Sequence, residues 1–319
     1  MDGVSIIVPA YNAERTIVDC LRAATNLNWP GNLEVIVIND GSTDRTEELA
    51  SSIAGVRVVT TANGGAAHAT NTAIRAARYA IVVSLDADAV LEPDWIQKIL
   101  PSFDEPGVGA VAGYAVTANK SIVGKLMGYD VELRLDRSPK YTDHLYTMNT
   151  AYLREALLQV GMLDESMKIA YDADLSRRLR AAGYKLVLIK DATCRHYWRD
   201  DLKGYIKQQY NYAYYRLLLT QKFGKPHDRL VSLGMVSQVP FTVLVVIIAA
   251  LLTGLLSPFG LLALFLIPLV HLPETVALLV KKKDRSVLLL PWFFSLRNLT
   301  WTWAAAVWGV RRLVGRSRA

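Results

Sequence analysis

The sequence predicts an α/β domain over residues 1–200, followed by an α-helical membrane region over residues 231–319. Short apolar runs alternate with helical segments in the first two hundred residues, which is the pattern of a parallel sheet covered by helices. Residues 231–280 then carry a single charged side chain, Glu274. An apolar stretch of that length with so little charge is typical of helices that cross a bilayer.

Four strands are expected in the first part of the chain, each a short apolar run bounded by residues that favour turns. They occupy residues 4–8, 33–40, 56–61 and 79–85. Helices are expected to connect them, over residues 13–24, 42–54 and 64–78. Because parallel neighbours need a crossover of about this length, the helices predict parallel pairing of the strands.

Fewer elements can be predicted in the second hundred residues. Residues 148–163 and 172–185 are expected to be helical, and residues 185–198 to form a final strand. Gly183 is expected as the C′ residue that ends the second helix. Residues 202–224 are aromatic, basic and long enough for a helix at a membrane surface. The soluble domain is therefore expected to end near residue 200, with an interfacial helix or linker over residues 201–230.

Charge and composition point to a membrane surface as a partner and exclude nucleic acid. The chain carries a net charge of +7 and is 52% hydrophobic. Residues 231–319 hold nine basic and two acidic side chains, so the whole excess lies beside the apolar segments. That placement suits anionic lipid headgroups, whereas a nucleic-acid binder would need a basic face on its soluble part. Two cysteines give no disulfide framework, and no basic segment precedes the first strand, so a cytosolic domain without a signal peptide is expected.

Polar turn residues follow all four predicted strands, at the ends where ligands of parallel α/β sheets gather. They are Pro9, Ala10, Tyr11 and Asn12 after the first strand, residues 39–41 after the second, residues 63–65 after the third, and Asp86, Ala87 and Asp88 after the fourth. One such loop would mean little, since these are ordinary turn residues. Four of them at one edge of a sheet predict a binding site.

Asp86 and Asp88 end a strand that is otherwise apolar, and unpaired carboxylates are costly to bury. Residues two apart along an extended chain point to the same side. The two carboxylates are therefore suited to share one divalent cation, which prefers oxygen ligands and also binds phosphates. A turn with two solvated aspartates is the alternative for this motif taken alone.

Four segments together resemble the inverting family 2 glycosyltransferases, which have the Rossmann-like GT-A fold. They are VSIIVPAYNAERTI, VIVINDGSTDRTEEL, NGGAAHATNTAI and VVSLDADAVLEPDWI, and the resemblance covers about residues 4–200. It implies a nucleoside-diphosphate sugar as donor and Mg²⁺ or Mn²⁺ as cofactor. The implied donor-binding residues are Pro9, Ala10, Tyr11, Asn12, Asp40, Gly64, Asp86, Ala87 and Asp88. The implied metal ligands are Asp86 and Asp88, with His196 either a third ligand or an ordinary buried or surface histidine.

The family usually places its catalytic base in a Glu-Asp pair at the start of a helix. The matching segment here is YDADLSRRL, so Asp172 takes the aspartate position and Tyr171 replaces the glutamate. Glycosyl transfer needs such a carboxylate, because the acceptor hydroxyl loses its proton as it attacks the anomeric carbon. The alternative is that Asp172 only caps the helix.

The acceptor side departs from the family pattern. A Lys or Arg often found after the Asn-Gly-Gly turn is Ala66 here, and a segment that often begins with glycine begins with Thr147, two residues before Asn149. Polymer-forming members carry a Gln-Gln/Arg-x-Arg-Trp motif on a following interfacial helix. This chain has Gln208, Gln209, Tyr210, Asn211 and Tyr212 there. The loss of the Arg-Trp pair favours transfer of single sugars, with Asn149, Gln208, Gln209 and Tyr212 as acceptor-side candidates.

The apolar region predicts two spanning helices, over residues 236–256 and 259–280. Residues 281–285 are mostly basic and would return to the cytoplasmic side. A third apolar segment, about residues 287–310, contains Arg297 and Asn298 near its middle. Since a charge is costly at the centre of a bilayer, this segment is expected to lie in the interface or re-enter, with a full span as the alternative.

Together these features predict a membrane-anchored, metal-dependent glycosyltransferase whose catalytic domain faces the cytoplasm. Its acceptor is expected to be a lipid-linked or otherwise membrane-held glycan. Two alternatives are a processive polysaccharide synthase and a catalytically silent subunit that binds nucleotide sugars.

Overall fold

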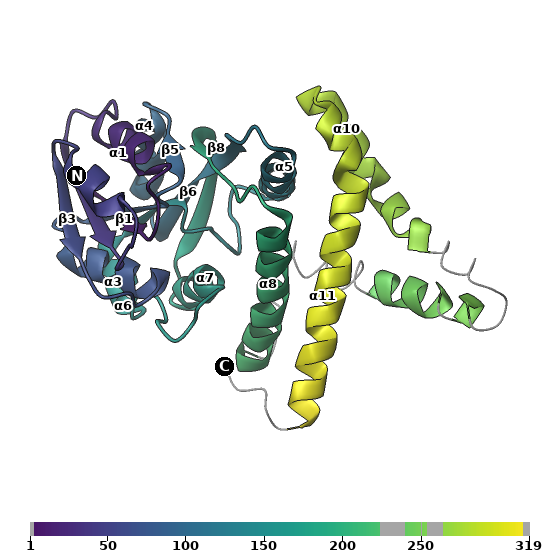
Figure 1. The fold of residues 1–319 in the computed structure, drawn as a ribbon. Coiled ribbons are helices and arrows are strands. Elements are labelled where there is room, and N and C mark those ends of the chain that lie inside the picture. The colour runs from purple at the N-terminus through teal and green to yellow at the C-terminus, as the bar shows by residue number, and fades with distance from the viewer. Residues whose placement is uncertain (1–2, 224–239, 250, 254–263, 315–319) are drawn as a thin grey trace. The chain divides into compact units, whose positions relative to one another are not determined.

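The computed structural model describes residues 3–223, 240–249, 251–253 and 264–314 (Figure 1). The chain forms two compact units. The first comprises Met1–Ala118 and Arg134–Trp198, and the second comprises Asn119–Leu133 and Arg199–Ala319.

The first unit is built on one eight-stranded sheet with the order β3-β2-β1-β4-β7-β6-β8-β5. The four predicted strands are confirmed as β1 (Gly3–Ala10), β2 (Asn32–Asn39), β3 (Val56–Thr60) and β4 (Ile81–Leu85). Each pairs in parallel with its neighbours among the four. Ala10 pairs with Asn39 and Asn39 with Thr60, so these strands end at the same level and their loops leave from one edge.

The rest of the sheet is mixed, so the parallel pairing predicted from the alternating strands and helices holds for β1 to β4. It consists of β5 (Ala89–Leu91), β6 (Val108–Thr117), β7 (Asn149–Leu153) and β8 (Lys185–His196). β7 runs antiparallel to both β4 and β6, and β5 runs antiparallel to β8. β6, which the sequence did not predict, pairs in parallel with β8.

The expected helix over residues 148–163 is wrong in its first half. Residues 149–153 form β7, and only Arg154–Gln159 are helical, as α6. The NTAYL segment lies between two strands and pairs with both β4 and β6. Those ladder hydrogen bonds outweigh the helical pattern of the sequence.

Helices cover the sheet and connect its strands. They are α1 (Ile17–Thr25), α2 (Thr46–Ser51), α3 (Ala66–Ala76), α4 (Trp95–Ile99), the 3₁₀ helix η1 (Leu100–Asp104), α6 and α7 (Tyr171–Ala181). Gly183 follows α7 with a φ of +91°, which confirms the predicted C′ glycine. The strands form the core: Ile6, Ile7, Ile36 and Val82 are fully buried.

The described part of the second unit is helical. It contains most of α5 (Ile122–Arg137), α8 (Leu202–Phe223), η3 (Pro268–His271), α10 (Leu272–Lys282), η4 (Arg285–Leu289) and α11 (Leu290–Leu313). α8 and α11 lie side by side (Figure 1), where Ala213 packs with Trp301 and Ala304. The indole of Trp301 donates a hydrogen bond of 3.0 Å to Gln209.

One helical segment among the described residues, Leu264–Lys282, is long and apolar enough to cross a membrane, judged by its 19-residue length and its composition. The predicted spans over residues 236–256 and 259–280 lie partly outside the described residues. Most of the third apolar segment lies in the continuous helix α11, and its first three residues belong to η4. Arg297, near its middle, is buried and forms an ion pair of 2.6 Å with Asp130 of α5.

Candidate active site

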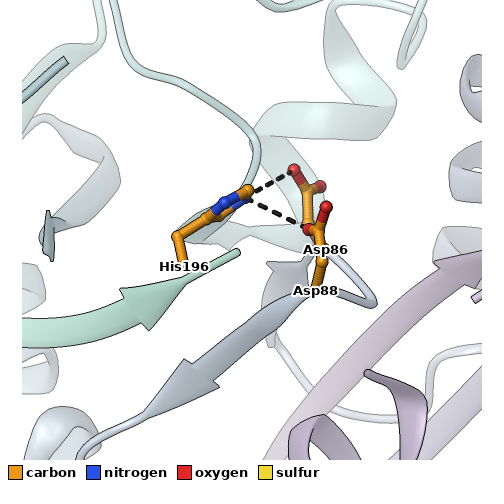
Figure 2. Close-up of side chains that lie close together, drawn as sticks. All are labelled: Asp86, Asp88 and His196. Atoms are coloured by element: carbon orange, nitrogen blue, oxygen red, sulfur yellow. Dashed lines mark ion pairs between the residues drawn. The ribbon is translucent and has the colours of Figure 1, made fainter. Parts of the chain in front are cut away.

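Asp86, Asp88 and His196 converge on one point (Figure 2). The His196 Nε2 atom lies 3.2 Å from Asp88 Oδ1 and 3.6 Å from Asp86 Oδ2. Asp86 follows β4, Asp88 precedes β5 and His196 ends β8. Ala89 of β5 pairs with His196, so the antiparallel β5–β8 ladder places the histidine beside the two aspartates.

The three side chains differ in their exposure to solvent. The two carboxylates are about 40% exposed, whereas His196 is 5% exposed and its ring stacks on Trp198 at 4.0 Å. Burial lowers the pKa of the His196 imidazole, but the charges of Asp88 and Asp86 outweigh it, so the net pKa lies above its ordinary value. Two carboxylates and an imidazole whose ligand atoms lie within 4.8 Å of one another are a donor set that suits a divalent cation such as Mn²⁺.

Asp40 fixes the turn that follows β3. Its two carboxylate oxygens accept hydrogen bonds from the backbone N–H groups of Gly64 and Gly65, at 2.7 and 2.9 Å. Asn63 donates to the Asp40 backbone carbonyl at 2.9 Å. Asp40 is 3% exposed, and Gly65 has a φ of +89°, a conformation that favours glycine. The loops after β2 and β3 are thus held together at the edge of the sheet.

The loop after β1 joins the same edge. Pro9 and Ala10 end β1, and Tyr11 beyond them is 54% exposed. Asn12 has a φ of +50° and accepts a hydrogen bond of 2.8 Å from the backbone of Thr43. The predicted donor-side residues therefore lie at the carboxyl ends of the four parallel strands. Ala87 is buried between the two cluster aspartates.

Asp172 lies in the first turn of α7 and is not its N-cap residue. The N-cap position belongs to Ala170, which has a φ of +64°. Asp172 Oδ1 accepts a hydrogen bond of 2.8 Å from the backbone N–H of Ala173. Its Oδ2 atom lies 3.6 Å from Nε2 of His144.

The buried Tyr152 of β7 lies near carboxylates from both parts of the site. Burial of this β7 side chain raises the pKa of its hydroxyl, and the charges of Asp172 and Asp86 raise it further. Asp172 and Asp86 therefore both lie near β7. Sequence reasoning missed Tyr152 and His144, because neither belongs to a recognised motif. Their position in the HLYTMNTAY stretch around Asn149 was the available signal.

The acceptor-side candidates belong to both units of the chain. Asn149 is buried at the start of β7, where it donates to the Cys194 sulfur at 3.0 Å. The other three lie on α8 in the second unit. Gln209 is buried, and its oxygen accepts the Trp301 hydrogen bond. Gln208 and Tyr212 interact with each other at 3.3 Å, and Tyr212 is 37% exposed.

Comparison with known proteins shows that the chain is similar to glycosyltransferases. Residues 5–160 match the family model Glycosyl transferase family 2. The chain is 31% identical over 225 residues to the poly-beta-1,6-N-acetyl-D-glucosamine synthase of Staphylococcus aureus (strain COL), and 30% identical to that of Staphylococcus epidermidis. These alignments cover 67% of this chain and 54% of each synthase, so the chain spans about half the length of the curated relatives it matches.

The fold also resembles a solved structure over nearly its whole length. This is the mannosyltransferase PcManGT from Pyrobaculum calidifontis, in complex with GDP-Man and Mn²⁺. The TM-score is 0.64 at 23% sequence identity, and the match covers 97% of this chain and 86% of that one. At this level of identity the likeness concerns the fold.

Proposed function

We propose, from the match of residues 5–160 to the family model Glycosyl transferase family 2, that the protein is a membrane-anchored, cation-dependent, inverting glycosyltransferase. It transfers a sugar from a nucleoside-diphosphate sugar to a lipid-linked or otherwise membrane-held glycan. The observation that carries this proposal is the convergence of Asp86, Asp88 and His196 at the edge of the sheet where the loops of β1 to β4 also meet.

These three residues fit a divalent cation by their chemistry. Their oxygen and nitrogen atoms face one point, and the burial of His196 restricts its ring to that direction. When bound, the cation neutralises negative charge on the diphosphate leaving group. The loops at Asn12 and Asp40 hold the nucleoside, and their mutual hydrogen bonds keep that part of the site in place before the donor arrives.

Asp172 is the proposed general base. Its carboxylate removes the proton of the acceptor hydroxyl while that oxygen forms a bond to the anomeric carbon. The bond from the anomeric carbon to the diphosphate oxygen breaks, and its electron pair leaves with the diphosphate. Attack from the opposite side inverts the anomeric centre. The first turn of α7 is a favourable place for the ionised carboxylate, because the helix dipole is positive there.

Membrane anchoring is proposed for the second unit. Large apolar side chains are exposed on several of its helices, both within the segment Leu264–Lys282 and outside it. They include Leu244, Ile247, Val276, Val280, Trp303 and Leu313. Apolar surface of this extent is characteristic of contact with lipid or protein rather than with water. The catalytic unit is proposed to face the cytoplasm, where nucleotide sugars are available.

A processive polysaccharide synthase is the second candidate function. It is favoured by the similarity over 225 residues to proteins named as poly-beta-1,6-N-acetyl-D-glucosamine synthases. The segment around Asn211 and Tyr212 favours single transfers instead, since the Arg-Trp pair of polymer-forming members is missing. The two functions differ in the length of their product.

A donor screen with matched variants tests the proposed function. The full chain is assayed in membrane vesicles with Mn²⁺, a panel of UDP-, GDP- and dTDP-sugars, and detection of the released nucleoside diphosphate. Asp88→Ala is expected to lose cation-dependent binding of the nucleoside diphosphate in calorimetry. Asp172→Asn is expected to keep that binding and lose transfer by about 10²-fold or more. Release from no donor in the panel, or equal loss of binding in both variants, would contradict the proposal.

A further inference from the structure

We infer that His144 is a positioning residue for the proposed base: its imidazole holds the Asp172 carboxylate in the orientation that receives the acceptor proton. This inference rests on the proposed function, since it assigns a role relative to Asp172. The two residues lie on separate elements, His144 on the segment before β7 and Asp172 in the first turn of α7.

One face of α7 is attached to the segment that carries His144. Asp172, Ser176 and Arg180 are spaced four apart, so they lie along the same side of the helix. The Ser176 hydroxyl accepts a hydrogen bond of 3.1 Å from the backbone of Leu145. Arg180 forms an ion pair of 2.9 Å with Asp143. The residues on both sides of His144 are therefore anchored to the second and third turns of the helix whose first turn carries the base.

The same segment is also anchored to the sheet. Tyr141 forms an isolated β-bridge with Val187 of β8. The backbone of Thr142 donates to Leu186 at 3.0 Å, and Leu188 donates to residue 140 at 2.8 Å. Attachment to both α7 and β8 leaves the backbone at residue 144 little freedom to move. A side chain on such a support is suited to hold a catalytic group, because precision of placement determines how well it works.

The imidazole itself is buried and directed at the base. The His144 side chain is 6% exposed, and its ring meets Tyr146 edge-on at 4.7 Å. Its Nε2 atom lies 3.6 Å from Asp172 Oδ2, longer than a hydrogen bond and within ion-pair range. Contacts of catalytic groups are often this long before substrate binds and shorten in the reacting complex. The Asp172 side chain is 22% exposed, so an acceptor can reach it.

Each oxygen of the Asp172 carboxylate has one of these contacts. Oδ1 accepts from the Ala173 backbone, and Oδ2 faces His144. One contact on each oxygen fixes the rotation of the carboxylate about its last bond. Each oxygen has about two lone-pair directions, so one remains on each for the acceptor hydroxyl. Of the other ionisable groups nearby, Tyr152 is buried and Asp174 is paired with Arg178 on α7.

Kinetics of four full-length variants in membrane vesicles test this role, using the radiolabelled nucleotide sugar selected by the donor screen. His144→Ala is expected to lower kcat about 10- to 100-fold, the range seen when a supporting partner of a site residue is removed. The KM for the donor should change little, because the nucleotide-binding loops are untouched. His144→Gln places an amide N–H near the position of Nε2 and should restore most of the lost kcat.

Arg180→Gln is the matched control, because it removes a contact between the same helix and the same segment without touching Asp172. Its kcat should fall much less than that of His144→Ala, because the backbone hydrogen bonds of residues 142, 145 and 188 still hold the segment. A kcat for His144→Ala equal to that of the unmodified chain would overturn the inference. So would equal losses in His144→Ala, His144→Gln and Arg180→Gln, which would indicate general loosening of the segment. Calorimetry with UDP or GDP and Mn²⁺ shows whether each variant is folded at the donor site.

Asp172→Asn separates failure of this inference from failure of the proposed function. If that variant transfers sugar normally, Asp172 is not the base and the assignment of His144 fails with it. If Asp172→Asn is inactive while His144→Ala is fully active, the proposed function stands and the positioning role alone is wrong.

Discussion

At the scale of single residues, the site depends on polar side chains that are held by other parts of the first unit before any ligand binds. His196 is directed by burial and by its stack on Trp198. The Asp40 carboxylate is held by hydrogen bonds from two backbone N–H groups, and the Asp172 carboxylate by a hydrogen bond from one. Ready-made geometry of this kind reduces the reorganisation that binding or reaction would otherwise require.

Asp40→Asn should weaken donor binding and lower the stability of the domain. The amide has one acceptor oxygen, so one of the N–H groups of Gly64 and Gly65 faces an NH₂ group instead. A hydrogen bond to a charged group contributes roughly 1.5–3 kcal/mol, and we expect a loss of stability of about that size. Thermal unfolding and titration with nucleoside diphosphate measure the two effects. Asp19→Asn, at an exposed position of α1, is the control; equal effects in both variants would contradict this account.

At the scale of elements, α5 and α11 are joined by a buried ion pair whose two residues lie far apart in the sequence. Arg297 and Asp130 are each 7% exposed in side-chain terms and form their ion pair 167 residues apart. The Arg297 guanidinium also lies over the rings of Phe294 and Trp301, at 4.4 and 5.0 Å. The carboxylate and the two aromatic faces compensate the buried positive charge of Arg297. That part of α11 therefore does not have to lie in water.

Arg297→Met should therefore destabilise the second unit strongly. Removing one partner of a buried ion pair leaves an unpaired charge and typically costs about 3–5 kcal/mol. The double variant Arg297→Met/Asp130→Leu should recover much of that loss, because neither charge remains. Thermal unfolding in detergent micelles measures the three proteins. Arg311→Met removes only an exposed hydrogen bond to Tyr214 and should lower the unfolding temperature far less. A double variant no more stable than the single one would argue against compensation by the pair.

α8 carries the prediction about product length. Asn211 and Tyr212 stand where polymer-forming members have the Arg-Trp pair, so one or two added sugars are expected on the acceptor after exhaustive reaction. Mass spectrometry of the acceptor distinguishes this product from a ladder. Asn211→Arg/Tyr212→Trp restores the motif and should lengthen the product if this helix limits it. A long ladder from the unmodified chain would show that the processive alternative is correct.

At the scale of the whole molecule, the two units differ in where their large apolar side chains lie. The first has a core of fully buried strand residues and a polar site at one sheet edge. The second exposes large apolar side chains on α10 and α11, among them Val276, Val280 and Trp303. The excess of basic residues also belongs to the second unit, where it suits contact with anionic lipid headgroups.

The topology of the chain is tested by labelling its C-terminal end. We predict two spans followed by an interfacial or re-entrant segment, which keeps Arg311 and Arg312 on the cytoplasmic side in accord with the positive-inside rule. A cysteine replaces Ser317 in a variant with Cys20→Ala and Cys194→Ala, which removes both native thiols. It should resist an impermeant thiol reagent applied to intact cells and react after the cells are opened. Labelling from outside would show that the third apolar segment crosses.

Much of the first half of the fold, and part of the site, could be predicted from the sequence because the information is local. The apolar runs of β1 to β4 and the turn residues after them are contiguous, and the spacing of Asp86 and Asp88 places both carboxylates on one side of an extended segment. The sequence by itself thus determined an α/β domain with a polar edge and an apolar region beyond it.

Only the tertiary structure decided which distant residues meet that edge. β7 is a strand because two neighbours offer it ladder hydrogen bonds, which no local pattern records. His196 reaches Asp88 through the β5–β8 ladder, and His144 reaches Asp172 because its segment is tied to α7. Arg297 looked costly from its apolar neighbours alone, and its partner Asp130 lies on another helix. Each of these pairings depends on packing between segments far apart in the chain, and sequence periodicity carries no information about such contacts.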